Sequence, residues 1–254
     1  MFQPKTERIK QLSDILPHRI EELSKIFGRK TNVYIDFANV MGWQEKLRWH
    51  IDVKRLKQFF SSFNTIENVK FYYGTLEGDN NSEQLIKDVR KFKYDVVTKP
   101  VKIMKISIDV SSISAQSPDI LNQFIRSSLL REMNIASIES LNSHLRTLNR
   151  QGILYLEERK CNFDVEIGRD MLLDYAKNKI DGFILCTGDS DFADPIRQLL
   201  DDGKKVVLFA TARKVASELN ALRSKGLLIY DIQKIRDFIC WPKEIKATKA
   251  KRTQ

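Results

Sequence analysis

The chain of 254 residues is 42% hydrophobic and 30% charged, a composition typical of an ordinary globular protein with one domain and additions. It has no apolar stretch long enough for a membrane span and no signal-peptide core near its start, so we expect a cytoplasmic protein without a membrane partner. Its three cysteines do not have the spacing of a zinc site, and we expect them to be reduced thiols. Its net charge of +10 either serves solubility alone or favours a polyanionic partner, for which nucleic acid is the leading candidate.

The N-terminal region is predicted to be helical. Between residues 5 and 28, apolar side chains recur at steps of three and four and form one stripe, which Pro17 interrupts. We therefore expect two short helices, or one kinked helix, in an N-terminal extension of residues 1–29. The apolar run Val33–Ile35 that follows predicts a buried parallel strand, which ends at Asp36.

Helical and strand patterns then alternate up to about residue 106. Asp52 is suited to cap a helix over 52–63, and Ser82 is suited to cap a helix over 82–92. The strands expected beside these helices are Asn68–Gly74 and Tyr94–Lys99, with further strand material over Val101–Ile106.

Residues 107–155 interrupt this rhythm and predict a mostly helical insertion. A serine-rich start precedes two helical patterns, over 118–133 and 137–152, and Gly152 is expected to end the second. Such an insertion suits a lid or a surface for a partner, including a second copy of the chain. Its arginines either line a path for RNA or cover solvated helix faces, and the isolated His144 suits a surface or packing role; the arginines are Arg126, Arg131, Arg146 and Arg150.

The alternation resumes after the insertion and predicts an α/β fold with a parallel sheet sandwiched by helices. This core domain is expected to span residues 30–240, followed by a basic tail over 241–254. The expected strands are Ile153–Glu157, Gly182–Cys186, Val206–Ala210 and Leu227–Tyr230, and the expected helices are Val165–Lys177, Phe192–Asp202 and Arg213–Arg223.

Several aspartates map to one edge of this sheet. Asp36 ends the first strand, Asp189 follows the strand 182–186 with Asp191 close behind it, and Asp164 begins a helix. Ligands of doubly wound sheets gather beyond the carboxyl ends of the strands. Converging carboxylates are relieved by a divalent cation, and oxygen-only ligation suits Mg²⁺ or Mn²⁺, which can activate water for attack on a phosphodiester.

Simpler roles compete with this interpretation. Asp191 and Asp164 could each cap a helix, whereas Asp36 has no expected helix start beside it. Asn39 is either a turn residue or a support for Asp36 or a metal-bound water, and Thr187 and Ser190 either bond a carboxylate or phosphate or belong to a plain turn. The chain has neither of the two glycine-rich loops that bind nucleotide phosphates, GxGxxG and GxxxxGK[ST].

The order of four motifs resembles the NYN domains of the LabA-like group, which are similar in fold to PIN nucleases. The motifs are DFANV at 36–40, K-x-x-x-D-V at 160–165, Asp170-Met171, and TGDSDF at 187–192 followed by GKKVVLFA. The resemblance covers about residues 30–98 and 156–232. It leaves the insertion and the N-terminal extension outside.

This resemblance implies a Rossmann-like, PIN-like sheet with an acidic ribonuclease site that uses Mg²⁺ or Mn²⁺ and acts on single-stranded or structured RNA. Its core acids and metal ligands would be Asp36, Asp164 and Asp189, with Asp191 as a fourth catalytic member. Asn39 would support the site and Lys160 would lie beside it, where it could contact a phosphate; Asp170 is a weaker candidate. With Thr187 and Ser190, which rest on the residues alone, Asn39 and Lys160 make up the candidate substrate-binding set. Phe163 departs from the family pattern and could narrow the site or stack a base.

The leading hypothesis is therefore a metal-dependent ribonuclease, endonucleolytic or otherwise, that hydrolyses RNA phosphodiester bonds at the aspartate cluster. The alternative is a catalytically weak RNA-binding or regulatory protein with the same fold, whose insertion engages a protein partner. A phosphatase for small phosphoesters would use the same metal chemistry.

Overall fold

The computed structural model describes residues 1–177, 180–211 and 215–242, and its chain forms two compact units. The larger, here called the sheet unit, contains Met1–Pro100 and the described residues from Asn162 onward. The smaller, here called the ribbon unit, is Val101–Cys161. The basic tail predicted over 241–254 lies outside the described residues from 243 onward.

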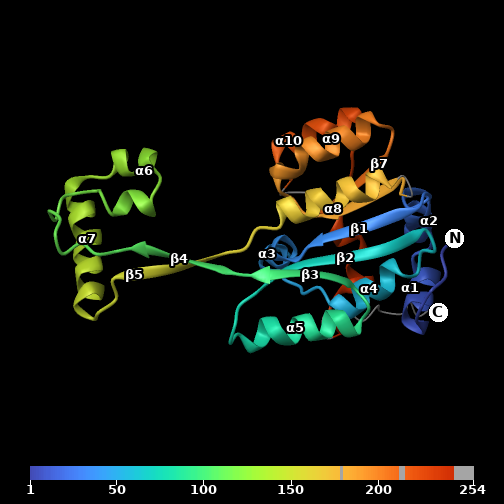
Figure 1. Ribbon diagram of the computed structural model, residues 1–254, viewed down its shortest axis with the longest axis horizontal. Coiled ribbons are helices and arrows are strands. Elements are labelled where there is room, and N and C mark those ends of the chain that lie inside the picture. Colours follow the sequence, from blue (N-terminus) through green and yellow to red (C-terminus); the bar gives the residue numbers. More distant parts are fainter. Residues whose placement is uncertain (178–179, 212–214, 243–254) are drawn as a thin grey trace, which may run out of the picture. The chain divides into compact units, whose positions relative to one another are not determined.

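The sheet unit is built on six parallel strands in the order β3-β2-β1-β6-β7-β8 (Figure 1). They are β1 (Thr31–Asp36), β2 (Ile66–Thr75), β3 (Asp95–Pro100), β6 (Gly182–Cys186), β7 (Lys205–Ala210) and β8 (Leu228–Asp231). Ile35 pairs with Phe71 on one side and Cys186 on the other. The strand order reverses between β1 and β6, which makes this the topological switch point of the sheet. The predicted α/β, Rossmann-like fold class is confirmed.

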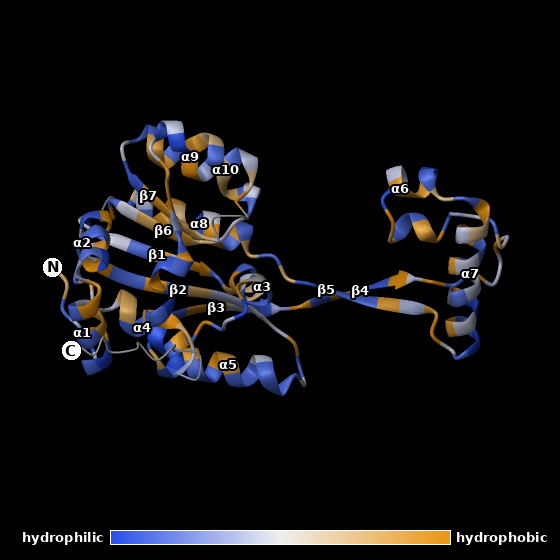
Figure 2. Cartoon of the chain, turned by 180° about the vertical axis from the view of Figure 1, so that it is seen from behind, coloured by the Kyte–Doolittle hydropathy of each residue, from blue (hydrophilic) through white to orange (hydrophobic). Residues whose placement is uncertain are grey.

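Helices cover both faces of the sheet. In Figure 1, α8 (Asp164–Ala176), α9 (Ala193–Asp201) and α10 (Ser217–Ala221) lie on one side, and α4 (Val53–Phe60) and α5 (Asn80–Lys91) lie on the other. Hydrophobic and hydrophilic residues alternate along α5 and α9 in the helical pattern (Figure 2), so each helix can bury one stripe and solvate the other. On α4, for example, Leu56, Phe59 and Phe60 are buried.

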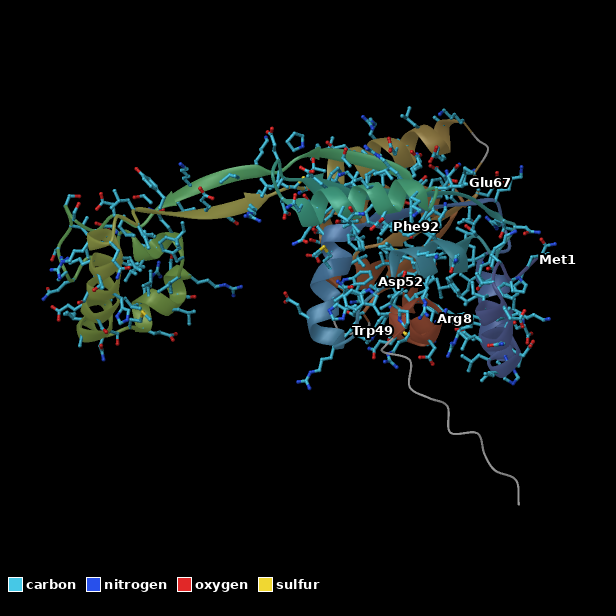
Figure 3. The ribbon with its side chains drawn as sticks, turned by 90° about the horizontal axis from the view of Figure 1, so that it is seen from below. Met1, Arg8, Trp49, Asp52, Glu67 and Phe92 are labelled. Atoms are coloured by element: carbon cyan, nitrogen blue, oxygen red, sulfur yellow. The ribbon has the colours of Figure 1, made fainter. Side chains whose placement is uncertain are left out.

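The N-terminal helices of the sheet unit follow the predicted break and contact its C-terminal residues. The predicted break at Pro17 is confirmed, because α1 (Glu7–Ile15) is followed by α2 (Pro17–Ile26) with proline at its first position. Arg8 on α1 donates to the carbonyl of Phe238 at 2.8 Å, within α11 (Arg236–Ile239), which follows η4 (Ile232–Ile235). Asp52 caps α4 as predicted and lies beside this junction together with Arg8 (Figure 3).

Three predicted helix starts need correction. Ser82 does not cap α5, which begins after Asp79; the Ser82 hydroxyl instead donates to the Asp79 carbonyl at 3.0 Å. The helix predicted from Phe192 begins as the short helix η2 (Ser190–Phe192) before α9. Of the helix predicted over 213–223, residues 213 and 214 lie outside the described residues, and the described part forms α10 followed by η3 (Leu222–Lys225).

The ribbon unit joins an antiparallel ribbon to a small helical cluster. The ribbon pairs β4 (Lys102–Ser107) with β5 (Tyr155–Lys160). The predicted helix over 118–133 is broken into η1 (Leu121–Gln123) and α6 (Ser127–Glu132), which pack with α7 (Ile135–Arg150) around a core of Leu121, Leu130 and Ile138. Gly152, with φ of +84°, follows the end of α7 as predicted. Among the described residues of the whole chain, no helix combines the length and apolar character needed to cross a membrane.

Candidate metal centre

The predicted aspartates of the sheet unit gather where the strand order reverses. Asp36 is the last residue of β1, and Asp189 follows the end of β6 by three residues. Asp191 lies in η2, and Asp164 is the first residue of α8. Strand ends and helix starts therefore bring residues that are far apart in sequence to one edge of the sheet.

Three of these carboxylates form a tight cluster. One carboxylate oxygen from each of Asp164, Asp189 and Asp191 lies within 4.8 Å of the others. Asp189 is held by its own loop, since its Oδ1 accepts a hydrogen bond from the backbone N–H of Asp191 at 3.2 Å. The Oδ2 atom of Asp164 is buried and has no hydrogen-bond partner. In the described chain no Lys or Arg forms an ion pair with any of the three.

Asp36 lies beside this cluster in a more buried position, with 7% of its surface exposed. Its two oxygens accept hydrogen bonds from Asn39, at 2.8 Å from the side-chain amide and 3.3 Å from the backbone N–H. Asp36 thereby caps α3 (Phe37–Leu47), a helix that the sequence analysis did not predict. Asn39 is thus a support for Asp36 rather than an ordinary turn residue.

The capping roles considered for Asp191 and Asp164 are not the observed ones. Asp189, not Asp191, provides the side-chain cap of η2, and α9 begins after Phe192 without a side-chain cap. Asp164 occupies the first turn of α8 instead of the cap position, and its backbone N–H donates to Asn162 at 2.7 Å. The carboxylates of Asp164 and Asp191 are therefore not needed to start either helix.

Burial and mutual repulsion shift the protonation of the cluster. Burial raises the pKa of Asp164 to about 6; the hydrogen bond with Asn162 opposes the rise, and the negative charges of Asp189, Asp191 and Asp36 add to it. Burial likewise raises the pKa of Asp36, against the hydrogen bonds from Asn39 and with a contribution from Asp189. Both raised pKa values therefore come mainly from burial, and the neighbouring carboxylates add to the rise.

The raised pKa of Asp164 predicts an unusual dependence of stability on pH. Because the folded pKa of Asp164 lies above its ordinary value of 3.8, the stabilisation linked to its protonation is present below about pH 4 and is lost as pH rises through about 6. Asp164→Asn should therefore raise the free energy of unfolding of the metal-free protein by about 1 kcal/mol at neutral pH, after allowance for solvent screening. Urea unfolding in a chelator, at acidic and neutral pH, measures this change. An Asp164→Asn protein less stable than the wild type at neutral pH would contradict it, and Asn in place of the exposed Asp14 is the control.

The donor set fits a hard divalent cation. All the available ligand atoms are carboxylate oxygens, which Mg²⁺ and Mn²⁺ prefer and which do not suit Zn²⁺. The buried Asp164 oxygen without a partner is an atom that a bound cation would satisfy. Asp164, Asp189 and Asp191 are therefore the residues that could hold such an ion, with Asp36 adjacent.

The predicted substrate-binding residues occupy three different settings. Thr187 is 1% exposed, which is inconsistent with direct contact with a substrate; its hydroxyl accepts from the Asp189 N–H at 3.3 Å and so orders the loop. Ser190 is partly exposed at the start of η2. Lys160 belongs to the ribbon unit, where it ends β5 and its ammonium lies 3.4 Å from the Glu158 carboxylate.

Two further residues weighed from the sequence have structural roles. Phe163 is 2% exposed beneath the Lys99 ammonium, so it cannot stack a base. Asp170 is also buried; it accepts a hydrogen bond from the Tyr72 hydroxyl at 2.8 Å and forms ion pairs with Arg169 at 2.9 Å and Lys70 at 3.8 Å. Because these contacts occupy its carboxylate, Asp170 is not part of the cluster of Asp164, Asp189 and Asp191.

A pocket beside Asp189 was not foreseen from the sequence. It has a volume of about 390 Å³ and is lined by Ala38, Asn39, Gly42, Trp43, Gly188 and Asp189. Four of these residues come from α3. The spacing of Phe37, Val40 and Leu47 after the capping Asp36 is the signal that could have revealed this helix.

Comparisons with known proteins bear on the family and on the fold. The family model of the NYN domain matches residues 112–226, less than half of the chain. The match includes Asp164, Asp189 and Asp191, excludes Asp36, and extends into the segment that the sequence analysis set outside the resemblance.

A solved structure is also similar, that of a protein of unknown function from Vibrio parahaemolyticus, with a TM-score of 0.50 and 18% identity over 83% of this chain and 96% of that one. At this identity the likeness bears on the fold alone. No curated protein matches the chain. The NYN match over residues 112–226 supports a relation to the NYN/PIN-like superfamily, and the parallel sheet with carboxylates at its switch point is consistent with it.

Proposed function

We propose that this protein is a metal-dependent ribonuclease that hydrolyses RNA phosphodiester bonds at the carboxylate cluster of Asp164, Asp189 and Asp191, with Asp36 beside it. The observation that carries the proposal is the convergence of these carboxylates without a basic partner in the described chain. An RNA phosphate is itself anionic, so it can approach the cluster only when a cation compensates both charges.

Each aspartate has a distinct task in this proposal. Asp164 and Asp189 hold Mg²⁺ or Mn²⁺ from the partly buried side of the cluster, and the exposed Asp191 joins them from the solvent side. Asp36 stays fixed by Asn39 beside the three ligands. When bound, the cation would polarise the phosphodiester and lower the pKa of a bound water. The loop from Thr187 to Asp191 holds its acids in place before substrate arrives, which limits the reorganisation needed for reaction.

RNA is the proposed substrate because of the NYN match and the net charge of +10. Membership of the LabA-like subgroup, contact of Lys160 with a phosphate, and a cytoplasmic location are further parts of the proposal. Assembly through the ribbon unit, with a second copy or another protein, also remains a prediction.

The test is an incubation of the purified full-length protein with end-labelled RNA. We expect shorter products with Mn²⁺ or Mg²⁺ and intact RNA with a chelator. Retention of RNA without cleavage in every metal would contradict the proposal and favour the RNA-binding alternative. Hydrolysis of a chromogenic phosphate ester without cleavage of RNA would instead favour a phosphatase.

A further inference from the structure

The ribbon of β4 and β5 has two outer edges with unused backbone groups. Within the described chain these strands pair only with each other, in a register that places Lys105 opposite Glu157. The N–H of Ile108 donates to the carbonyl of Leu154 at 2.9 Å, and hydrogen-bonded pairs alternate along an antiparallel ribbon. The backbone groups of Lys105 on β4, and of Glu157 and Arg159 on β5, therefore point outward, where a further strand can pair with them.

Charge distinguishes the two outer edges. β4 has lysines at positions 102 and 105 and no acid, so two copies of this strand repel each other. β5 reads YLEERK, with two acids followed by two bases, and all of its residues are exposed, including 54% of Tyr155 and 44% of Leu156. When two copies of β5 run antiparallel, acids of one copy face bases of the other. The edge of β5 is thus complementary to itself, as a two-fold interface requires.

We infer that two copies of this chain pair along the outer edges of their β5 strands, antiparallel about a two-fold axis at Glu158. The inference gives a strand and a register to the assembly proposed through the ribbon unit, and it does not depend on RNA cleavage. Glu157 lies opposite the partner's Arg159, and symmetry repeats this contact. Each of these pairs exchanges two backbone hydrogen bonds, so the interface has about four. Leu156 packs on the methylene stem of the partner's Lys160.

Neighbouring registers are less favourable. The outward backbone groups restrict the axis to whole residue positions of β5. An axis at Glu157 sets this acid against its own copy, and an axis at Arg159 sets two arginines together and shortens the overlap, because β5 ends at Lys160. With the axis at Glu158, the two copies of this acid face each other. Lys160 of the same chain compensates each copy, since its ammonium lies 3.4 Å from the Glu158 carboxylate.

Sedimentation velocity of the full-length protein tests the pairing. We expect a dimer that forms with rising concentration, up to about 100 µM, because an interface of this size is weak. Glu157→Pro removes an outward N–H that the ribbon itself does not use, and it should abolish the dimer. Lys105→Pro makes the same change on the outer edge of β4 and should leave the dimer intact. Far-UV circular dichroism should show the same strand content in both variants.

Charge reversal tests the register. Arg159→Glu places like charges in both symmetry-related pairs and should raise the dissociation constant at least about tenfold. Combining it with Glu157→Arg exchanges the charges and should return the constant to within about threefold of the wild-type value. A general loss of ribbon structure cannot give this recovery, because the second substitution would only add to the damage.

The outcomes separate this inference from the proposed function. A protein that stays monomeric at every concentration, or a dimer that Glu157→Pro leaves intact, overturns the inference even if RNA is cleaved. A dimer that is insensitive to Arg159→Glu, or that the charge exchange does not restore, overturns the register. A dimer that responds as expected supports the inference even if the wild type never cleaves RNA in any metal, a result that would overturn only the ribonuclease proposal.

Discussion

Replacing Asp189 with asparagine should reduce metal-dependent RNA cleavage about a thousandfold, because a divalent cation contributes several kcal/mol to stabilising the charge that develops in the reaction. Asp189 is the central carboxylate of the site: it belongs to the cluster, and its charge acts on both Asp36 and Asp164. Asparagine keeps the shape of the side chain and is itself a favoured cap, so η2 and the fold should be retained. Initial rates with end-labelled RNA and saturating Mn²⁺ measure the effect.

Asp194 supplies a matched control for this substitution. It lies only five residues further along the chain, but its side chain is 85% exposed and pairs with Arg197. Asp194→Asn should therefore cleave RNA at nearly the wild-type rate. Equal rates for the two variants would remove Asp189 from the site, whereas loss of cleavage in both would point to a general effect of charge on this face.

Replacing Asp174 with alanine should lower the free energy of unfolding by about 2–4 kcal/mol, because it removes the nearer counter-charge of a buried lysine and the acceptor of two buried hydrogen bonds. One oxygen of Asp174 accepts hydrogen bonds from Asn32 at 2.8 Å and from the Tyr34 hydroxyl at 2.6 Å, and it lies 3.0 Å from the Lys70 ammonium. Only 12% of the Lys70 side chain is exposed, and the carboxylate of Asp170 lies 3.8 Å from the same ammonium. This network joins α8 to β1 and β2, and urea unfolding of the full-length protein measures its contribution.

The exposed ion pair between Asp201 and Lys225, 2.8 Å long, is the control for this prediction. Asp201→Ala should cost less than about 1 kcal/mol, because water screens exposed pairs. Adding Lys70→Met to Asp174→Ala should restore part of the lost stability, since it removes a buried charge that has lost its nearer partner. If Asp174→Ala costs no more than Asp201→Ala, the buried network does not stabilise the fold as argued.

The same network has a defined pH dependence. Burial alone would raise the pKa of Asp174, but hydrogen bonds from Tyr34, Lys70 and Asn32 outweigh burial and lower it. The stabilisation is therefore present above about pH 4 and is lost as pH falls through the lowered pKa. This direction is opposite to that expected for Asp164, so the two aspartates can be told apart in a pH series.

Much of the fold could be predicted because strand periodicity and helix stops act locally. Gly182–Cys186 is an unbroken apolar run and forms a strand with those bounds. Pro17 is the first residue of α2, the position where its ring disrupts no helical hydrogen bond. By contrast, α3 was missed because Asp36 was interpreted only as the end of a strand, although the same carboxylate caps the next helix. Asp36 both ends β1 and caps α3, and a sequence pattern that assigns each residue to a single element cannot show both roles.

The candidate site was predictable in its acids but not in their grouping. The topology of alternating strands and helices brings Asp36, Asp164 and Asp189 to one sheet edge, as expected. Which oxygens converge depends on loop geometry: the turn that lets Asp189 cap η2 also carries Asp191 into the cluster, and Asn39 holds Asp36 to one side. Thr187 and Phe163 were weighed as binding residues because sequence alone did not reveal that both are buried.

The measurement that tests the central claim most directly is anomalous scattering from a crystal of the full-length protein soaked in Mn²⁺. We predict a peak between the carboxylates of Asp164, Asp189 and Asp191, at about 2.0–2.2 Å from their oxygens, as expected for a hard divalent ion. The same soak of an Asp189→Asn crystal should lose the peak. A wild-type crystal with manganese bound elsewhere but none at these three aspartates would contradict the proposed metal centre.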